Sequence, residues 1–312
     1  MSKSDKIKIL SVNISEKKGT VKIPQKSIEL NEHGVKGDAH SGKWHRQVSL
    51  LAKESIDKFS RESGRQIKYG EFAENITTEG ILLHKLNPMD LLMNEEIELM
   101  VTQIGKKCHG DNCNIFKEVG NCVMPKEGIF AKVIKGGKVK KGDTFKLVQK
   151  VIKCAIIVLS DRASIGEYKD KSGTLLKIEL EKFFQSIKYP VNTIINVIPD
   201  EEQILRETVY DLLNNGIDII FTSGGTGIGP RDITPEVIDP ILEKEIPGIM
   251  DAVRLKFGTN YPNSLISRSK AGIVKQTLVF TLPGSPKAVI EYFNELKKLI
   301  YHLLLMVRGL NH

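Results

Sequence analysis

The sequence predicts two domains: a β-rich, barrel-like N-terminal domain over residues 1–149, and an α/β C-terminal domain with a mainly parallel open sheet over residues 150–312. Length supports two domains, because 312 residues exceed the usual size of one. Charge also separates the halves. Residues 1–150 hold 27 lysines and arginines against 19 acidic residues, whereas residues 151–312 hold 19 of each, so the net charge of +8 belongs to the first half.

Apolar runs alternate with amphipathic segments in the second half. The runs are typical of strands buried on both faces, and they lie at residues 155–159, 194–198, 217–221 and 278–282. The segments between them carry apolar residues at helical spacing. Ahead of one such segment, Asp200 and Gln203 predict a capping box. This alternation predicts parallel strands with helices on both faces of the sheet.

The first half contains short strand-like segments punctuated by glycine and asparagine, at residues 8–14, 48–51, 97–101 and 144–148. One helix is predicted at residues 53–59. Many short strands with turn residues between them are typical of a barrel. We expect the domain boundary near residues 147–152, without a Gly/Ser/Pro-rich linker.

The composition argues against several classes of protein. The lysines of the first half are scattered and lack interleaved aromatic residues, which favours a solubilising surface or an anionic ligand over nucleic acid. Residues 1–6 lack the apolar core of a signal peptide, and the apolar run at residues 303–307 is too short to span a bilayer. Four cysteines do not make a disulfide framework in so long a chain. We therefore expect a cytoplasmic protein that binds neither nucleic acid nor membrane.

Polar clusters follow the predicted strands of the second half, at residues 160–164 with 170–173, 199–202, 222–236 and 283–288. Ligands of open α/β sheets bind outside the carboxyl ends of the strands, so we expect these clusters to meet at one edge. Each cluster also has a purely structural interpretation. Asp200, Ser172 and Ser285 can be helix caps, Asp161 can bond to its own turn, and the glycines can simply permit a tight turn.

The cluster after the third strand carries the clearest chemical pattern, Ser223-Gly-Gly-Thr-Gly227 followed by Asp232. Glycines and hydroxyl residues after a strand allow main-chain N–H groups to turn toward a phosphate. Phosphate binding alone does not require the Asp232 carboxylate, but a metal ion would. The pattern therefore indicates nucleotide or phosphate chemistry.

Stretches of the second half, in order, resemble the molybdopterin adenylyltransferase family, the Mog-type domain related to the gephyrin G domain. They are Ser160-Asp-Arg-Ala-Ser164, Asp170-Lys-Ser-Gly173, Ile198-Pro-Asp-Glu201, Ser223-Gly-Gly-Thr-Gly227 with Asp232-Ile-Thr-Pro-Glu236, Ser267-Arg-Ser-Lys-Ala-Gly272 and Leu282-Pro-Gly-Ser-Pro-Lys-Ala288. The resemblance implies transfer of AMP from ATP to the terminal phosphate of molybdopterin, with release of pyrophosphate. It also implies a homotrimer formed through this domain.

The same resemblance assigns roles to individual residues. Asp200 and Asp232 match the two acidic positions of the family, and are implied to be catalytic and to hold Mg²⁺ on the ATP phosphates. The other implied substrate-binding residues are Asp161, Ser172, Gly173, Ser223, Gly224, Gly225, Thr226, Gly227, Pro283, Gly284, Ser285 and Lys287. Among them, residues 224–227 are expected to cradle phosphate, and Lys287 to offset developing charge.

The first half resembles the MOSC domain, named for the C-terminal domain of molybdenum cofactor sulfurase, over residues 5–148. The motifs are Gly37-Asp-Ala-His40, Arg46-Gln-Val-Ser-Leu-Leu51, Gly70-Glu-Phe-Ala-Glu-Asn-Ile-Thr77, Val101-Thr-Gln-Ile-Gly-Lys-Lys-Cys-His109 and Gly136-Gly-Lys-Val-Lys-Lys-Gly-Asp143. The resemblance implies a barrel-like fold that binds molybdenum cofactor or handles sulfur. Arg46 and Asn75 are expected to grip the cofactor's phosphate or pterin.

Cys108 matches the characteristic cysteine of the MOSC family, and is expected to be catalytic through a persulfide or a contact to molybdenum. Neighbouring lysines and His109 can keep its thiolate nucleophilic. Two alternatives remain open for Cys108, Cys113 and Cys122: a zinc site, which lacks the usual close cysteine pair, and three thiols without a role. Cys154 lies in a predicted strand, and we expect it in the core.

Other functions remain open for the whole chain. A non-catalytic molybdopterin carrier or assembly protein, delivering to other molybdenum cofactor enzymes, would bind pterin without consuming ATP. A Rossmann-type dehydrogenase is disfavoured, because the glycine-rich loop follows the third strand and no acidic residue stands at the required place after it.

Overall fold

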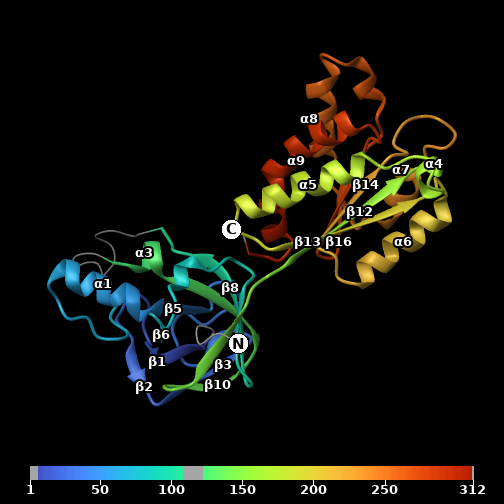
Figure 1. Cartoon of the computed structure of the whole chain (residues 1–312). Coiled ribbons are helices and arrows are strands. Elements are labelled where there is room, and N and C mark those ends of the chain that lie inside the picture. Colours follow the sequence, from blue (N-terminus) through green and yellow to red (C-terminus); the bar gives the residue numbers. More distant parts are fainter. Residues whose placement is uncertain (1–5, 108–121, 311–312) are drawn as a thin grey trace. The chain divides into compact units, whose positions relative to one another are not determined.

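The computed structural model describes residues 6–107 and 122–310, and the chain divides into two compact units, Met1–Lys150 and Val151–His312 (Figure 1). Each unit has its own cluster of buried apolar side chains. Across the described ranges, the helices are all too short or too polar to span a bilayer.

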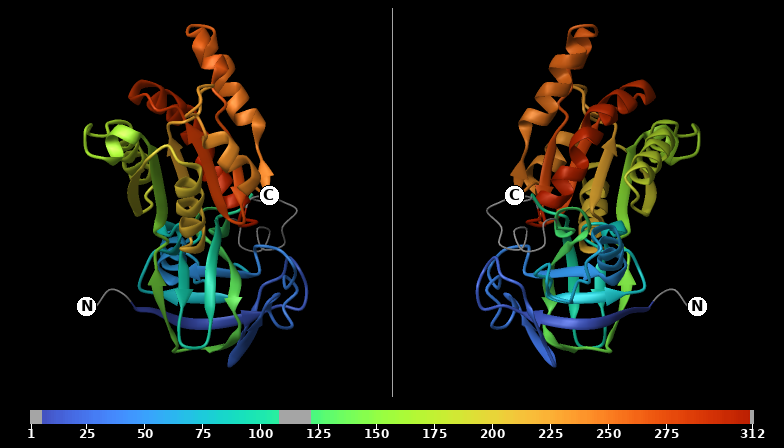
Figure 2. Two further views of the ribbon diagram at one scale, coloured as in Figure 1. Left: turned by 90° about the vertical axis from the view of Figure 1, so that its right-hand side faces the viewer. Right: turned by 90° about the vertical axis from the view of Figure 1, so that its left-hand side faces the viewer.

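The N-terminal unit contains a closed barrel, seen from two sides in Figure 2. Within the described residues seven strands follow one another around it: β1 (Lys6–Ile14), β11 (Thr144–Val148), β7 (Leu91–Met93), β8 (Glu98–Ile104), β9 (Ile129–Lys135), β5 (Val48–Ala52) and β6 (Ile76–Glu79). The barrel closes because β6 pairs again with β1. Among the pairs of these described strands, only β5–β6 is parallel. The β-rich, barrel-like prediction is confirmed for this unit.

Alternation of charged and apolar residues explains why β1 forms a strand of the barrel. Ile7 and Ile9 are buried while Lys6 and Lys8 are exposed, the pattern of a strand with one face toward a core. Smaller elements complete the unit: β2 (Ile23–Gln25), β3 (Ser27–Asn31), β4 (Gly34–Val35), η1 (Leu83–Lys85), α3 (Met124–Glu127) and β10 (Gly137–Lys140). Helix α1 (Lys53–Ser63) extends the predicted helix by one turn, and it packs through Phe59 against the ring of Phe72.

The C-terminal unit is a six-stranded sheet among the described residues, in the order β13 (Val191–Ile198), β12 (Ile152–Leu159), β14 (Ile219–Ser223), β17 (Thr277–Leu282), β16 (Ala271–Val274) and β15 (Lys244–Glu245). The first four strands run parallel to one another. Strand β16 pairs antiparallel with β17, and β15 pairs antiparallel with β16. Helices cover both faces, as Figure 1 shows. Helices α6 (Glu202–Asn214) and α7 (Thr234–Ile238) pack on one face, with α5 (Ser172–Ser186) and α9 (Pro286–Met306) on the other.

The central strands are buried on both faces because their apolar runs do not alternate. In β14, the ring of Phe221 packs against Phe280 of β17 and Phe293 of α9. On the opposite face, Ile220 joins residues of α6 such as Leu205 and Val209. The helical layers therefore hold the strand ends at fixed positions. Further helices complete the unit: α4 (Asp161–Ser164), η3 (Asp239–Ile241), α8 (Pro247–Gly258) and η4 (Pro262–Ile266).

The predicted capping box at the start of α6 is wrong. The N-cap residue is Glu201, and its side chain makes no capping hydrogen bond. The Asp200 carboxylate accepts instead from the main chain of Asp161, and Gln203 donates to Glu207. A carboxylate accepts from whichever donor lies within reach, and here that donor is the N–H of Asp161, just after the neighbouring strand.

Candidate functional site

The carboxyl ends of the four parallel strands enclose a cavity of about 750 Å³. Its wall includes residues 160–162 after β12, Asp200 after β13, residues 224–227 after β14 and residues 283–285 after β17. The predicted convergence of the polar clusters at one edge of the sheet is therefore confirmed. Such an edge is where open α/β sheets bind ligands.

Three aspartates and one arginine meet in this cavity. The Asp161 N–H donates to Asp200 Oδ2 at 3.2 Å, and the Asp200 N–H donates to Asp161 Oδ1 at 3.0 Å, so each residue holds the other. Arg231 donates through Nη2 to both oxygens of Asp161, at 2.6 and 2.7 Å. Asp200 and Asp232 form no ion pair among the described residues, which leaves their negative charges available to a cation.

The pKa values of two of these carboxyl groups move in opposite directions. Burial is the main cause that raises the pKa of Asp200, and the negative charges of Asp161 and Asp232 add to it. The hydrogen bond from Arg231 lowers the pKa of Asp161.

The glycine-rich loop after β14 brings main-chain donors to the cavity wall. Within the described chain, the N–H groups of residues 225–227 donate to no protein acceptor. Gly224 is fastened at both ends: its N–H donates to the Leu282 carbonyl at 3.0 Å, and its carbonyl accepts from Thr234 Oγ1 at 2.8 Å. Gly225 has a φ of 64°, and a Cβ there would lie 2.5 Å from Thr234 Oγ1. Only glycine fits this turn, whose successive N–H groups suit an anion.

Three predicted site residues lie behind the cavity wall rather than in it. Ser223 Oγ donates to Ser172 Oγ at 3.1 Å and approaches the Pro283 carbonyl at 3.4 Å. Ser172 donates in turn to Asp170, which also accepts from the N–H of Gly173 at 3.1 Å. These hydroxyl groups join β14, the start of α5 and the loop after β17. Their predicted direct contact with substrate stays a prediction.

Lys287 and Ser285 stand at the start of α9. Ser285 lines the cavity and also caps the helix, because its Oγ accepts from the Ala288 N–H at 3.3 Å. Lys287 is exposed beside the cavity, where its Nζ lies 3.0 Å from Tyr261 Oη and 3.8 Å from a carboxylate oxygen of Glu291. To bind a substrate phosphate, the Lys287 ammonium would have to leave Tyr261 and Glu291.

The cavity has further polar residues that were not predicted individually as site residues, although Arg162 and Ser267 stand in stretches that resemble the family: Arg162, Arg231, Asn263, Ser264, Ser267, Glu291 and Tyr292. Arg231 directly precedes Asp232, so its proximity could have been inferred from the loop. Asn263 and Ser264 belong to η4, which follows no strand end of the sheet. No local signal in the sequence connects η4 with the glycine-rich loop.

The two unpaired aspartates fit a divalent cation that completes its shell from substrate. Among residues 6–107 and 122–310, no group of three His, Cys, Asp or Glu side chains is arranged to hold a metal. Mg²⁺ usually keeps several waters, and binds through one or two carboxylates together with substrate phosphates. One cavity contains both parts: the carboxylates of Asp200 and Asp232 for the cation, and the amides of residues 225–227 for the substrate phosphates.

The N-terminal unit buries a second polar cluster, centred on the ion pair between Lys22 and Asp38, whose side chains are each 1% exposed. Asp38 also accepts from Asn75 Nδ2 at 3.0 Å and from the His40 N–H at 2.9 Å. Burial alone raises the pKa of Asp38, but the hydrogen bonds from His40 and Lys22 outweigh it and hold the pKa below its usual range. Burial raises the pKa of the nearby Glu74 and lowers that of Lys22.

Arg46 lies between two aromatic rings in the same unit. Its guanidinium carbon is 4.8 Å from the centroid of Trp44 and 5.9 Å from that of Phe130. Its Nε is buried and has no hydrogen-bond partner within the described residues. Cation–π contacts of this kind orient a guanidinium without neutralising it, so Arg46 can still bind an anion.

The predicted cysteines are only partly described by the structure. Cys108, predicted as catalytic, and Cys113 lie outside the described residues. Cys122 is half-buried, and Cys154 is fully buried in β12, as predicted for a core residue.

Comparison with known proteins decides the family. A family model for the probable molybdopterin binding domain matches residues 155–302, and a model for the MOSC domain matches residues 37–146. A molybdopterin adenylyltransferase of Pyrococcus furiosus is 32% identical over 164 residues, which cover 51% of this chain and 93% of that protein. The chain belongs to the molybdopterin-binding domain family, and it also carries a MOSC domain.

Other relatives match about half of this chain. A molybdopterin adenylyltransferase of Haemophilus influenzae is 32% identical over 148 residues, or 47% of this chain and 74% of that protein. A molybdenum cofactor biosynthesis bifunctional protein of Chlorobaculum tepidum is 33% identical over 159 residues, or 51% of this chain. The match spans 49% of that bifunctional protein, about half its length.

Proposed function

We propose that the molybdopterin-binding domain transfers AMP from Mg²⁺-bound ATP to the terminal phosphate of molybdopterin. The observation that carries this proposal is the cavity in which three unpartnered main-chain amides, residues 225–227, lie with the unpaired Asp200 and Asp232. The names of the relatives, molybdopterin adenylyltransferases, supply the substrate class.

The reaction joins two anionic phosphates, so the residues act mainly by positioning and by charge neutralisation. A phosphate oxygen of molybdopterin attacks the α-phosphorus of ATP, and the bond from that phosphorus to the pyrophosphate oxygen breaks. Residues 225–227 would hold phosphate oxygens through their N–H groups. Asp200 and Asp232 would hold Mg²⁺, which supplies positive charge to the phosphates when bound. Arg231 can exchange its exposed pairing with Asp161 for a substrate phosphate, because such surface pairs contribute little stability.

Incubation of the full chain with molybdopterin, ATP and Mg²⁺ tests the proposal. We expect pyrophosphate and adenylylated molybdopterin in equal amounts, and no product after chelation of the metal. Omission of molybdopterin is the control for simple ATP hydrolysis. ATP turnover that does not depend on molybdopterin would contradict the proposed acceptor.

The alternative function is a non-catalytic carrier or assembly protein. A carrier would bind molybdopterin, and adding Mg²⁺ with ATP would release no pyrophosphate. The retained pair of acids and the complete glycine-rich loop favour the enzyme, because pterin binding alone needs no metal site.

For the MOSC domain we propose binding of a later form of the cofactor, or transfer of sulfur to it, with Cys108 as the reactive thiol. Arg46, held between Trp44 and Phe130, supports an anionic ligand such as the cofactor's phosphate. Fusion would raise the local concentration of product at this domain. Cys108→Ser is expected to abolish delivery of sulfur or cofactor while leaving adenylyl transfer unchanged. Normal delivery by that variant would exclude a reactive Cys108.

A further inference from the structure

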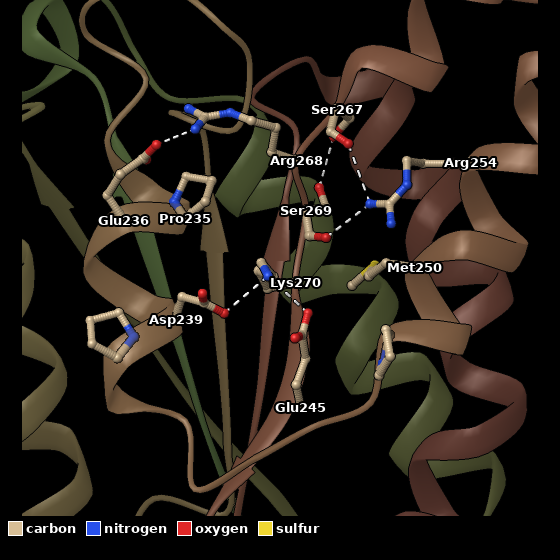
Figure 3. Close-up of a pocket in the computed structure, with 12 residues that line it drawn as sticks. Pro235, Glu236, Asp239, Glu245, Met250, Arg254, Ser267, Arg268, Ser269 and Lys270 are labelled. Carbon is tan, nitrogen blue, oxygen red and sulfur yellow. Dashed lines mark hydrogen bonds and ion pairs between the residues drawn. The ribbon is translucent and has the colours of Figure 1, made fainter.

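Residues 267–270, named here the wall segment, border two cavities of the C-terminal unit. Ser267 lines both the cavity at the strand ends and a second one of about 620 Å³, shown in Figure 3. Neighbouring elements brace this segment. Arg254 of α8 donates to the carbonyls of Ser267 and Ser269, at 3.3 and 3.0 Å, and Lys270 pairs with two acidic residues across the second cavity.

Arg268 of the wall segment reaches back to the glycine-rich loop. Its Nε donates to the Gly227 carbonyl at 2.7 Å, and its Nη2 donates to the Asp232 carbonyl, also at 2.7 Å. Its main-chain N–H donates to the Thr226 carbonyl at 2.8 Å. The remaining nitrogen, Nη1, pairs with Glu236 of α7, as Figure 3 shows. One side chain therefore holds both ends of the loop at residues 227–232.

The geometry of the guanidinium gives this arrangement its rigidity. Its N–H donors form a planar fork, so two carbonyls bound to it are held at a fixed separation. The loop between them contains Gly227 and Gly229, which would otherwise permit many conformations. Within the loop, the Gly229 N–H donates to Asp232 Oδ2 at 2.8 Å. The direction of the Asp232 carboxylate therefore depends on the position of both ends.

We propose that Arg268 is a positioning residue, which closes the loop at residues 227–232 and so holds the Asp232 carboxylate in the cavity that Asp200 also lines. This inference rests on the proposed adenylyl transfer for its catalytic consequence. Arg268 does not line the cavity, so it acts through Asp232 and touches no substrate.

Arg268→Met tests the inference, since it keeps an unbranched apolar stem and removes all the donors of the guanidinium. We expect the affinity for Mn²⁺, measured by electron paramagnetic resonance with a non-hydrolysable ATP analogue, to fall about 10- to 100-fold, as for other residues that orient metal ligands. Amide hydrogen exchange at residues 227–233 is expected to accelerate, with strand β14 unchanged. In the assay, the Mg²⁺ requirement should rise more than the KM for molybdopterin.

Arg254→Met is the matched control, because Arg254 also donates to two carbonyls of the wall segment but, within the described part of the chain, donates no hydrogen bond to residues 227–232. Glu236→Gln removes the ion pair and keeps the carbonyl contacts of Arg268. Both controls are expected to bind Mn²⁺ within about threefold of the unaltered protein. If Arg268→Met does not fold, Arg268→Lys decides, because a single ammonium cannot reproduce the fork.

Two results would overturn the inference: unchanged Mn²⁺ affinity and loop exchange in Arg268→Met, or equal losses in Arg254→Met. If the proposed adenylyl transfer is wrong, the unaltered protein makes no adenylylated product. The hydrogen-exchange measurement still reports whether Arg268 closes the loop, so the two failures can be distinguished.

Discussion

Asp232→Asn is expected to lower the rate of adenylyl transfer by roughly 10²- to 10³-fold, with the fold retained. The amide removes the negative charge that a metal ligand at this position needs. Its oxygen can still accept from the Gly229 N–H, as Asp232 Oδ2 does now, so the loop conformation is expected to survive. Initial rates of pyrophosphate release at saturating Mg²⁺ measure the loss, and circular dichroism checks the fold.

Asp200→Asn is expected to have an effect of the same size. Because burial and its anionic neighbours raise the pKa of Asp200, its carboxylate is lost at a higher pH than that of an ordinary aspartate. Protons compete with Mg²⁺ for this carboxylate, so the Mg²⁺ concentration needed for half-maximal activity should rise on acidification from a higher pH than an unperturbed carboxyl would give. Asp200→Asn should lack this step.

Glu202→Gln is the control for both variants, because it removes an equal charge two residues from Asp200, at an exposed position outside the cavity wall. We expect it to retain full activity. If Asp200→Asn and Asp232→Asn also kept full activity with unchanged Mg²⁺ dependence, the metal-holding role would have to be abandoned.

Lys22→Met is expected to lower the free energy of unfolding of the N-terminal unit by about 3–5 kcal/mol, the usual cost of removing one partner from a buried ion pair. The side chains of Lys22 and Asp38 are each 1% exposed, so water cannot replace the lost ammonium. The chain has a single tryptophan, Trp44, which lies in this unit. Its fluorescence during urea denaturation therefore reports on the N-terminal unit alone.

The destabilisation should depend on pH in one direction. The pKa of Asp38 is held below its usual range, so its contribution to stability is complete above the unfolded-state pKa of about 4, and is lost as the pH falls through the folded-state pKa. The difference between unaltered protein and Lys22→Met should narrow over that acidic range. Lys26→Met, at an exposed position nearby, is expected to change stability by less than about 0.5 kcal/mol. Equal effects of the two lysine substitutions would refute the buried-pair interpretation.

Periodicity and local chemistry were enough to predict much of the C-terminal unit. Non-alternating apolar runs such as residues 217–221 indicated strands buried on both faces, because a strand between two helical layers has no polar face. Parallel strands place their carboxyl ends at one edge, so the meeting of Asp200, Asp232 and the glycine-rich loop followed from topology. Gly225 was readable as a turn residue, since its positive φ excludes larger side chains.

Contacts between distant segments depended on the tertiary structure. Arg231 neutralises Asp161 from seventy positions away, and Arg268 donates to the Gly227 and Asp232 carbonyls from a segment that follows no strand end. The Asp200 side chain accepts from Asp161 rather than capping its own helix. A polar side chain bonds to whichever partner the packed fold brings nearest. Such a contact produces no periodic pattern in the sequence.

The two units illustrate the same division between sequence and structure. Short apolar segments and glycines determined that the first half would be β-rich and that the second half would alternate strands with helices. Only the folded N-terminal unit brought Lys22, Asp38 and Asn75 together in a buried cluster. The sequence does not predict these contacts, although Asp38 and Asn75 stand in motifs that resemble the MOSC domain, because burial of a charge is favourable only when all its partners are already in place.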